Sequence, residues 1–315
     1  MTPCSNYFTT KFEKKFLVSV NDSEYNFQKI NSWKDFIEKF SYLTPAIQNY
    51  CVNVGSGNPA FIIYNLYKYS NLDIEWVKDF LINCKTGETS YIVFMLYKEH
   101  KLDIEWVKDF LINCKTGNPS HAVFYLFTDE NELDLNWVKI FIENCKIGDP
   151  ATYGFFLCQL YTYNLKSKWL KKLITNQKVG EPALVAFNAL NVQYLNKSWC
   201  INFIEKCKVG NPLIAIYLLA RYYQYSRKKA EQIIKDSKIG DPSLPAYLMW
   251  RNFSSPKKWM IDIIKDQKTG DSEFVKYLIE HYNILDDVTK RHYIYNICKI
   301  KSILYSSCLF DELFN

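Results

Sequence analysis

A sixteen-residue segment, LDIEWVKDFLINCKTG, occurs at residues 72–87 and again, unchanged, at residues 102–117. The two copies start thirty residues apart, and weaker versions follow along the rest of the chain. A fixed period of this length is typical of repeat proteins, in which each unit buries its apolar face against its neighbours. The chain is therefore expected to form one elongated array instead of a compact domain.

A glycine marks each period. Eight of the ten glycines recur every 30 to 32 residues: Gly57, Gly87, Gly117, Gly148, Gly180, Gly210, Gly240 and Gly270. Most are followed by a polar residue and a proline, as in Asn58-Pro59. Such a pair starts a helix, because the polar side chain can serve as the N-cap and proline at the first helical position loses no hydrogen bond. A first helix is thus predicted after each glycine.

A second helix is predicted in the later half of each repeat. Asp103 is expected to be its N-cap, and Val107, Phe110 and Leu111 then fall on one helical face. The repeat ends with lysine, any residue and glycine. We expect the lysine in the last helical turn, where it complements the helix dipole, and the glycine just beyond it in the left-handed conformation. These lysines are Lys85, Lys115, Lys146, Lys178, Lys208, Lys238 and Lys268.

Aromatic residues recur at fixed positions in both helices. The first helices carry Tyr64, Phe94, Phe124, Phe155, Phe187, Tyr217, Tyr247 and Tyr277. The second helices carry Trp76, Trp106, Trp137, Trp169, Trp199 and Trp259. Apolar residues at helical spacing usually face a core, so the first-helix ladder is expected to pack between successive repeats.

Together these signals predict an all-α fold, an α-solenoid of about eight antiparallel helix pairs with capping helices at both ends. We assign residues 1–57 to an N-terminal cap and residues 58–270 to seven repeats of about 30 residues. Residues 271–315 are assigned to a degenerate eighth repeat, in which Lys301 replaces the glycine, and to a C-terminal cap. Terminal repeats deviate because one of their faces meets solvent.

Composition restricts the cellular setting. The hydrophobic content of 48% suits a continuous core, while the net charge of +6 is modest for 315 residues. The ten cysteines form no CxxC pair, and neither a signal peptide nor an apolar run of membrane-spanning length is evident. We expect an intracellular protein with reduced thiols, in the cytoplasm or nucleus. Frequent Lys, Asn, Ile, Tyr and Phe suggest an AT-rich genome of a protist, bacterium or large virus, and a viral protein would lie in the host cytoplasm.

No residue pattern indicates catalysis. The four histidines form neither a metalloprotease motif nor a pair with a nucleophilic cysteine. The segment Gly55-Ser56-Gly57 lacks the lysine and hydroxyl residue of a phosphate-binding loop. Cysteines that precede the repeated lysine would lie roughly 9–10 Å apart in successive repeats, too far to share a metal ion. We therefore expect no enzyme activity, metal, cofactor or small-molecule substrate.

Basic residues are concentrated in the second helices of the later repeats. The candidates for a surface that binds an anionic partner are Lys166, Lys168, Lys171, Lys172, Arg227, Lys228, Lys229, Lys257 and Lys258. A basic stripe on a repeat protein could follow a nucleic-acid backbone. The competing interpretation is that these residues form solvated helix faces and that the repeated lysines serve as helix-end partners.

The segment Gly148-Asp149-Pro150-Ala151 joins two predicted helix pairs through glycine, a polar residue and alanine. With an aromatic residue and a leucine in the helix that follows, the chain resembles the Sel1-like and tetratricopeptide class of α-solenoids, most closely at residues 229–247. Its period of 30 is shorter than in either family, and the glycine-bearing loop between the Sel1 helices is absent. The resemblance implies a scaffold or adaptor, and no site residues carry over.

Three functions are left open by the sequence. The favoured one is a non-catalytic scaffold that binds another protein through an extended solenoid surface. The alternatives are a nucleic-acid or polyanion binder that uses the basic later repeats, and a structural component of a larger assembly such as a viral particle.

Overall fold

The computed structural model describes residues 34, 37, 41–55, 57–161, 167–252 and 258–266. The regular structure in these residues is helical, with no strand. A short 3-10 helix, η2 (Ser41–Leu43), precedes α3 (Thr44–Asn53), and the helices that follow are α4 (Pro59–Tyr69), α5 (Ile74–Asn83), α6 (Thr89–Lys98), α7 (Ile104–Asn113), α8 (Pro119–Thr128), α9 (Leu135–Asn144), α10 (Pro150–Leu160), α11 (Ser167–Asn176), α12 (Pro182–Asn191), α13 (Lys197–Lys206), α14 (Pro212–Tyr222), α15 (Arg227–Asp236), α16 (Ser243–Asn252) and α17 (Lys258–Asp266).

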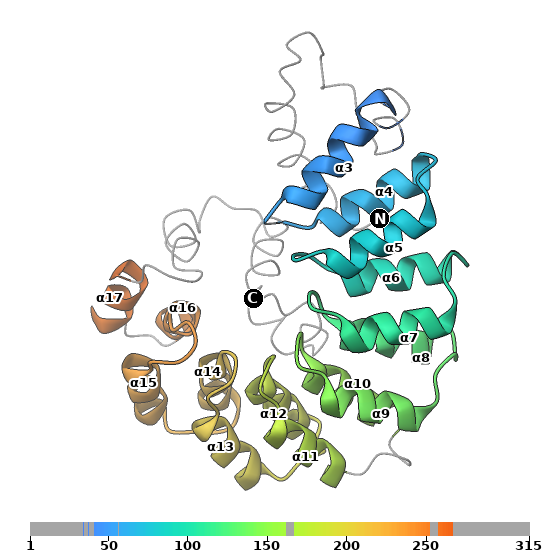
Figure 1. Cartoon of the computed structure of the whole chain (residues 1–315). Coiled ribbons are helices and arrows are strands. Elements are labelled where there is room, and N and C mark those ends of the chain that lie inside the picture. The colour runs from blue at the N-terminus through green and yellow to red at the C-terminus, as the bar shows by residue number, and fades with distance from the viewer. Residues whose placement is uncertain are drawn as a thin grey trace.

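Helices α4 to α17 form consecutive pairs, in which the even-numbered helix is the first helix of a repeat and the odd-numbered helix is the second. Each first helix packs against the first helix of the next pair, from α4 on α6 to α14 on α16. Figure 1 shows the pairs arranged along a curve, with α10, α12, α14 and α16 on its inner side and α9, α11, α13 and α15 on its outer side. The predicted all-α solenoid is confirmed.

Parts of the predicted organisation fall outside the described residues. Most of the N-terminal cap is among them, although α3 lies within the 1–57 segment. The eighth repeat and C-terminal cap at 271–315 also lie outside, as does Gly270. The predicted boundaries at these two ends stay predictions.

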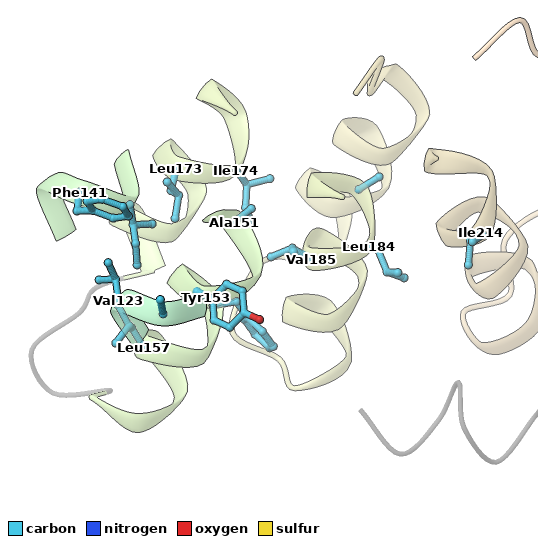
Figure 2. Packing of buried hydrophobic residues seen from close by; sticks show 14 of the residues in the cluster. Val123, Phe141, Ala151, Tyr153, Leu157, Leu173, Ile174, Leu184, Val185 and Ile214 are labelled. Atoms are coloured by element: carbon cyan, nitrogen blue, oxygen red, sulfur yellow. The ribbon is translucent and has the colours of Figure 1, made fainter. Parts of the chain in front are cut away.

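The buried core fills the space between the first and second helices. Figure 2 shows Val123, Ala151 and Leu157 of the first helices near Phe141 and Leu173 of the second helices. The predicted first-helix aromatic ladder is almost entirely buried: Tyr64, Phe94, Phe155, Phe187, Tyr217 and Tyr247. Phe124 is the exception and is only partly buried.

The tryptophans lie at the edge of this core. Trp76, Trp106 and Trp137 are half-buried on the outer helices. Each stacks on the phenylalanine one helical turn later, as Trp106 does on Phe110 with ring centroids 5.4 Å apart. The tryptophan ladder therefore packs within each second helix and shields the core from solvent.

The second helices begin as predicted. The side chain of Asp103 accepts a hydrogen bond from the backbone N–H of Trp106 at 2.8 Å, and Asp134 accepts from Trp137 at 3.2 Å. Asn196 performs the same task at the start of α13. These bonds satisfy helix-start donors that have no partner inside the helix.

Most first helices begin at the predicted positions, and α16 begins one residue later, at Ser243. The N-cap residues Asn58, Glu88, Asn118, Asp149, Glu181 and Asn211 make no side-chain capping bond to their own helix. Instead, Asn58 Oδ1 accepts from the backbone N–H of Glu88 in the next repeat at 3.2 Å. The predicted capping role was therefore wrong at Asn58, Asn118, Asp149 and Asn211, whereas the predicted cap Asp241 does accept the backbone N–H of Ser243 at 2.9 Å.

Equivalent bonds continue along the array. The backbone N–H groups of Asp149 and Glu181 donate to the preceding N-cap side chain at 3.2 Å, and that of Asn211 donates to Glu181 Oε2 at 2.8 Å. We call the acceptor side chains Asn58, Asn118, Asp149 and Glu181 the inter-repeat ladder. It ties four pairs of successive repeats together at the first-helix start.

The predicted end of the second helix was also wrong. Helix α5 ends at Asn83, and its C-cap Cys84 is already extended, with φ −65° and ψ 128°. Lys85 therefore lies beyond the last helical turn and cannot act as its dipole partner. Gly87 has the predicted positive φ, 88°, but it is the third residue after Cys84 rather than the first.

Close contact with the start of the first helix explains the glycine. A Cβ on Gly87 would lie 2.9 Å from the backbone Cα of Asn58, the first residue of the same repeat. The chain leaves the second helix early so that the glycine can pass this close to the start of the previous first helix. Glycine is thus required both for its φ angle and for the space it leaves.

The left-handed helix cap occurs at the end of the first helix and is not made by glycine. His100 has φ 57°, and the next N–H, of Lys101, donates to the carbonyl of Leu96 at 3.0 Å. Gln193 has the same φ at the end of α12. These contacts form a Schellman motif, which satisfies the last carbonyls of the helix.

Candidate interaction surfaces

The predicted basic candidates on α11 are exposed but engaged locally. Lys172 lies 3.5 Å from the carboxylate of Glu143, and the Lys171 ammonium lies 5.0 Å from the ring centre of Trp199 in the next repeat. Lys168 is also exposed on this helix. Lys166 lies outside the described residues.

The candidates on α15 are engaged in the same way. Arg227 Nε donates to Glu231 at 2.9 Å, and Lys229 Nζ lies 2.5 Å from Glu205. Lys228 of this helix and Lys258 of α17 are exposed, whereas Lys257 lies outside the described residues. Of the seven candidates that the structure describes, four are thus engaged with neighbouring side chains, and the anionic-partner surface stays a prediction.

A different set of cations forms a regular row. Lys85, Lys115, Lys146, Lys178, Lys208 and Lys238 are all exposed, one in each loop that leads from a second helix to the next first helix. We call them the loop lysines. None takes part in an ion pair with another described residue. Sequence reasoning found these residues but placed them in the last helical turn, where they would have had a partner.

Two acidic residues of the same loops, Asp149 and Glu181, form hydrogen bonds with the next repeat and not with the loop lysines. Asp149 accepts hydrogen bonds from Glu181 N–H and from the hydroxyl of Thr152, and Glu181 accepts from Asn211 N–H. Burial raises the pKa of Asp149, and burial together with the nearby Asp149 charge raises the pKa of Glu181 to about 7. These carboxylates belong to the inter-repeat ladder and leave the loop lysines uncompensated.

Partly exposed aromatic residues line the first helices of the early repeats. Tyr91 of α6 stacks on His121 of α8 with ring centres 5.7 Å apart, and Phe124 of α8 lies 5.9 Å from Phe156 of α10. Tyr125 connects the two groups, 4.8 Å from His121. We call these five residues the inner aromatic surface. It crosses three successive repeats on the layer of first helices, which forms the inner side of the array (Figure 1).

The outer side has a shallow apolar groove between α7 and α9. It encloses about 490 Å³ and is lined by residues that include Ile112, Trp137, Ile140 and Phe141. Ile112 and Ile140 are 60% and 62% exposed. The groove contains no pair of groups suited to acid–base or nucleophilic chemistry.

The cysteines of the loops serve the turn itself. Cys114 Sγ donates to the carbonyl of Thr116 at 3.0 Å, and Ser237 Oγ makes the equivalent bond to Ile239 at 2.8 Å. Burial raises the pKa of the Cys114 thiol, which keeps it protonated and unreactive. Across the part of the chain that the structure describes, no three His, Cys, Asp or Glu residues are grouped as a metal site requires.

Comparison with known proteins adds no relative. No protein-family model, curated protein or solved structure matches the chain. Within the described ranges, every helix is too short or too polar to cross a membrane.

Proposed function

We propose that the chain is a non-catalytic scaffold that binds another protein through the inner aromatic surface. The observation that carries this proposal is the continuity of Tyr91, His121, Tyr125, Phe124 and Phe156 across α6, α8 and α10. Tyrosine and phenylalanine are enriched at protein interfaces, where large rings contribute contact area at little conformational cost. The likeness to Sel1-like and tetratricopeptide solenoids supports the same role.

The first-helix layer is suited to an extended partner. Other aromatic residues of the first helices differ in burial: Phe155 and Phe187 are buried, Phe61 and Tyr97 are partly buried, and Tyr222 of α14 is exposed. In α6 and α8, Tyr91 is 36% exposed and His121 is partly exposed. A partner that covers these rings would bury apolar surface now in contact with water, and that burial would drive binding.

The test compares two triple variants as baits in extracts of the native cell. In the first, Tyr91, His121 and Phe156 are each replaced by serine. In the control, the exposed outer residues Ile82, Ile112 and Ile140 are replaced by serine, so that both variants lose three apolar surface side chains. We expect a specific partner to be captured by the wild type and the control but lost by the inner-face variant, with circular dichroism unchanged. Equal capture by both variants would contradict the proposal.

A further inference from the structure

The loop lysines carry no structural role that would account for them. Each lies beyond the helix that precedes it, as Lys85 lies two residues after Asn83, so none complements a helix dipole within the last turn. Their side chains are exposed in all six loops and form no ion pair with another described residue. A cation in every repeat, always exposed, is a row of binding charges.

The surroundings of the row carry both signs. Lys206 and Lys235 occupy the last turns of α13 and α15, next to two of the loops, while the exposed carboxylates Glu143 and Asp236 lie at the ends of α9 and α15. Of the carboxylates in the loops, those of Asp149 and Glu181 accept backbone N–H groups of the following repeat, and that of Asp241 accepts from Ser243. Glu88 is exposed and offsets one of the six charges.

The row has little apolar surface beside it. The exposed large hydrophobic residues of the described structure lie outside these loops, and the apolar groove between α7 and α9 borders the row at one position, Lys146. Lysine is depleted from the centres of protein–protein interfaces, which rely on aromatic, methionine and arginine anchors. Lysines that neutralise successive phosphates, on the other hand, supply most of the affinity of sequence-independent nucleic-acid binding.

We propose that the loop lysines bind the sugar–phosphate backbone of a single-stranded nucleic acid that follows one rim of the solenoid. Successive first helices pack at helix–helix distances of roughly 8–10 Å, so each repeat presents one cation per step of that length. The array is curved (Figure 1). Duplex DNA, with a persistence length of about 50 nm, resists bending around a curve of protein dimensions, whereas a single strand follows it at little cost.

The row of loop lysines is distinct from the inner aromatic surface, so each proposal can be tested without the other. The contacts are to phosphates alone and do not read bases. Binding is therefore expected to depend strongly on salt and weakly on sequence.

The experiment measures fluorescence anisotropy of a labelled thirty-nucleotide poly-dT strand with the full chain at increasing salt. If all six lysines contact phosphates, the slope of log affinity against log salt should be about −4. The test variant replaces the six loop lysines by glutamine. The matched control replaces six other exposed lysines, Lys98, Lys101, Lys168, Lys172, Lys197 and Lys228, so both variants lose the same charge. We expect the test variant to lose roughly 100-fold or more in affinity at low salt and most of the slope, and the control to keep the slope.

Four results would overturn the proposal. They are no binding by the wild type at low salt, equal loss in the two variants, equal affinity for a duplex of the same length, and displacement of the strand by poly-glutamate of equal charge. The last result would assign the row to an acidic polypeptide. If the six-fold variant does not fold, two variants with three substitutions each are made instead. One replaces Lys85, Lys115 and Lys146, and the other replaces Lys178, Lys208 and Lys238. Each should remove about half of the slope. The inner-face serine variant should bind poly-dT like the wild type.

Discussion

Left-handed backbone occurs twice in each of several repeats, and different residue types occupy the two positions. At the end of the second-helix loop it is always glycine, with φ between 67° and 88° in the described repeats. At the end of the first helix it is His100, Asn131, Gln193 or Gln224, with φ between 54° and 57°. The two cases differ in crowding: Gly148 lies against Asn118, at the start of its own repeat, whereas the side chains of the first-helix caps are exposed.

Three glycine-to-alanine variants separate backbone strain from crowding. Gly55 has neither a positive φ nor a neighbour within 4 Å, Gly57 has φ 84° and no neighbour, and Gly148 has φ 71° with a Cβ position 2.9 Å from the Cα of Asn118. We expect Gly55→Ala to be near neutral, Gly57→Ala to cost about 1–2 kcal/mol, and Gly148→Ala to cost more than Gly57→Ala. Urea denaturation, monitored by circular dichroism, gives the free energy of unfolding of each variant and so ranks the three losses of stability. Equal midpoints for Gly57→Ala and Gly148→Ala would show that the crowding has no energetic effect.

The reverse substitution tests the first-helix cap. His100→Gly removes the penalty of a side chain in the left-handed conformation but increases the freedom of the unfolded chain, so a net stabilisation of about 0.5–1 kcal/mol is expected. The measurement is again the free energy of unfolding. His121→Gly, inside α8, is the control and should destabilise the protein, because glycine is unfavourable in a helix interior.

A cysteine exchange tests the turn-forming role of the thiols. Cys145 Sγ donates to the carbonyl of Ile147, and in a later loop Ser237 Oγ donates to the carbonyl of Ile239 in the same way. Because a serine hydroxyl can make this bond, Cys145→Ser should leave the melting temperature nearly unchanged. Cys145→Ala removes the donor and should lower it. A large loss in the serine variant would indicate that the sulfur has a further function.

At the scale of the element, the first helices are joined by the inter-repeat ladder as well as by their apolar packing. Its acceptor is an asparagine amide at Asn58 and Asn118 but a carboxylate at Asp149 and Glu181. Burial raises the pKa of both acids, so their ionised forms are disfavoured in the folded protein. The neutral amides avoid this cost, and the carboxylates make the middle of the array sensitive to pH.

Glu181→Gln should remove part of that sensitivity. The pKa of Glu181 rises from 4.5 to about 7 on folding, so the unfolded state loses its proton first as pH increases. Wild-type stability should therefore fall between about pH 4.5 and pH 7, and the variant should be more stable above pH 7 by an amount on the order of 1–3 kcal/mol. The two proteins should converge near pH 4.

The measurement is the urea midpoint as a function of pH. Glu88→Gln makes the same substitution at the equivalent but exposed position and serves as the control for the change of side chain. If Glu181→Gln is less stable than the wild type at pH 8, the ionised carboxylate must be stabilising, and the inferred direction of the pKa shift would be wrong.

At the scale of the whole molecule, stability is distributed along the array because each helix pair touches only its neighbours. Removal of residues 88–117 tests this directly. The deletion joins Gly87 to Asn118, and since residues 72–87 and 102–117 are identical, the new junction has the same local sequence as the old one. We expect a shorter protein with unchanged helicity per residue, still cooperatively folded and somewhat less stable.

Small-angle scattering measures the maximum dimension of the molecule, which should change. Circular dichroism measures the helical signal per residue, which should stay constant. Loss of folding in the deletion would instead indicate a single global core, as a globular domain has. Deletion of residues 95–109, half a period, joins the first part of α6 to the last part of α7 and puts the later repeats out of register. It is the control and should lower the helical signal per residue.

The sequence by itself determined the helix pairs, their period and most of their starting positions. These features depend on local chemistry: Asp103 caps the helix that follows it, proline at 59 starts one, and the spacing of Val107, Phe110 and Leu111 defines a buried face. Each can be recognised within a few residues of chain.

Only the tertiary structure decided what the repeats present to one another and to a partner. The amide of Asn58 bonds a residue thirty positions away, Gly87 and Gly148 lie against the start of a first helix about thirty residues earlier, and Phe124 is partly exposed while its described equivalents are buried. The loop lysines became a candidate surface only when the second helices were seen to end before them. These properties depend on the distance and angle between neighbouring repeats, which are set by packing across the whole array and leave no local pattern in the chain.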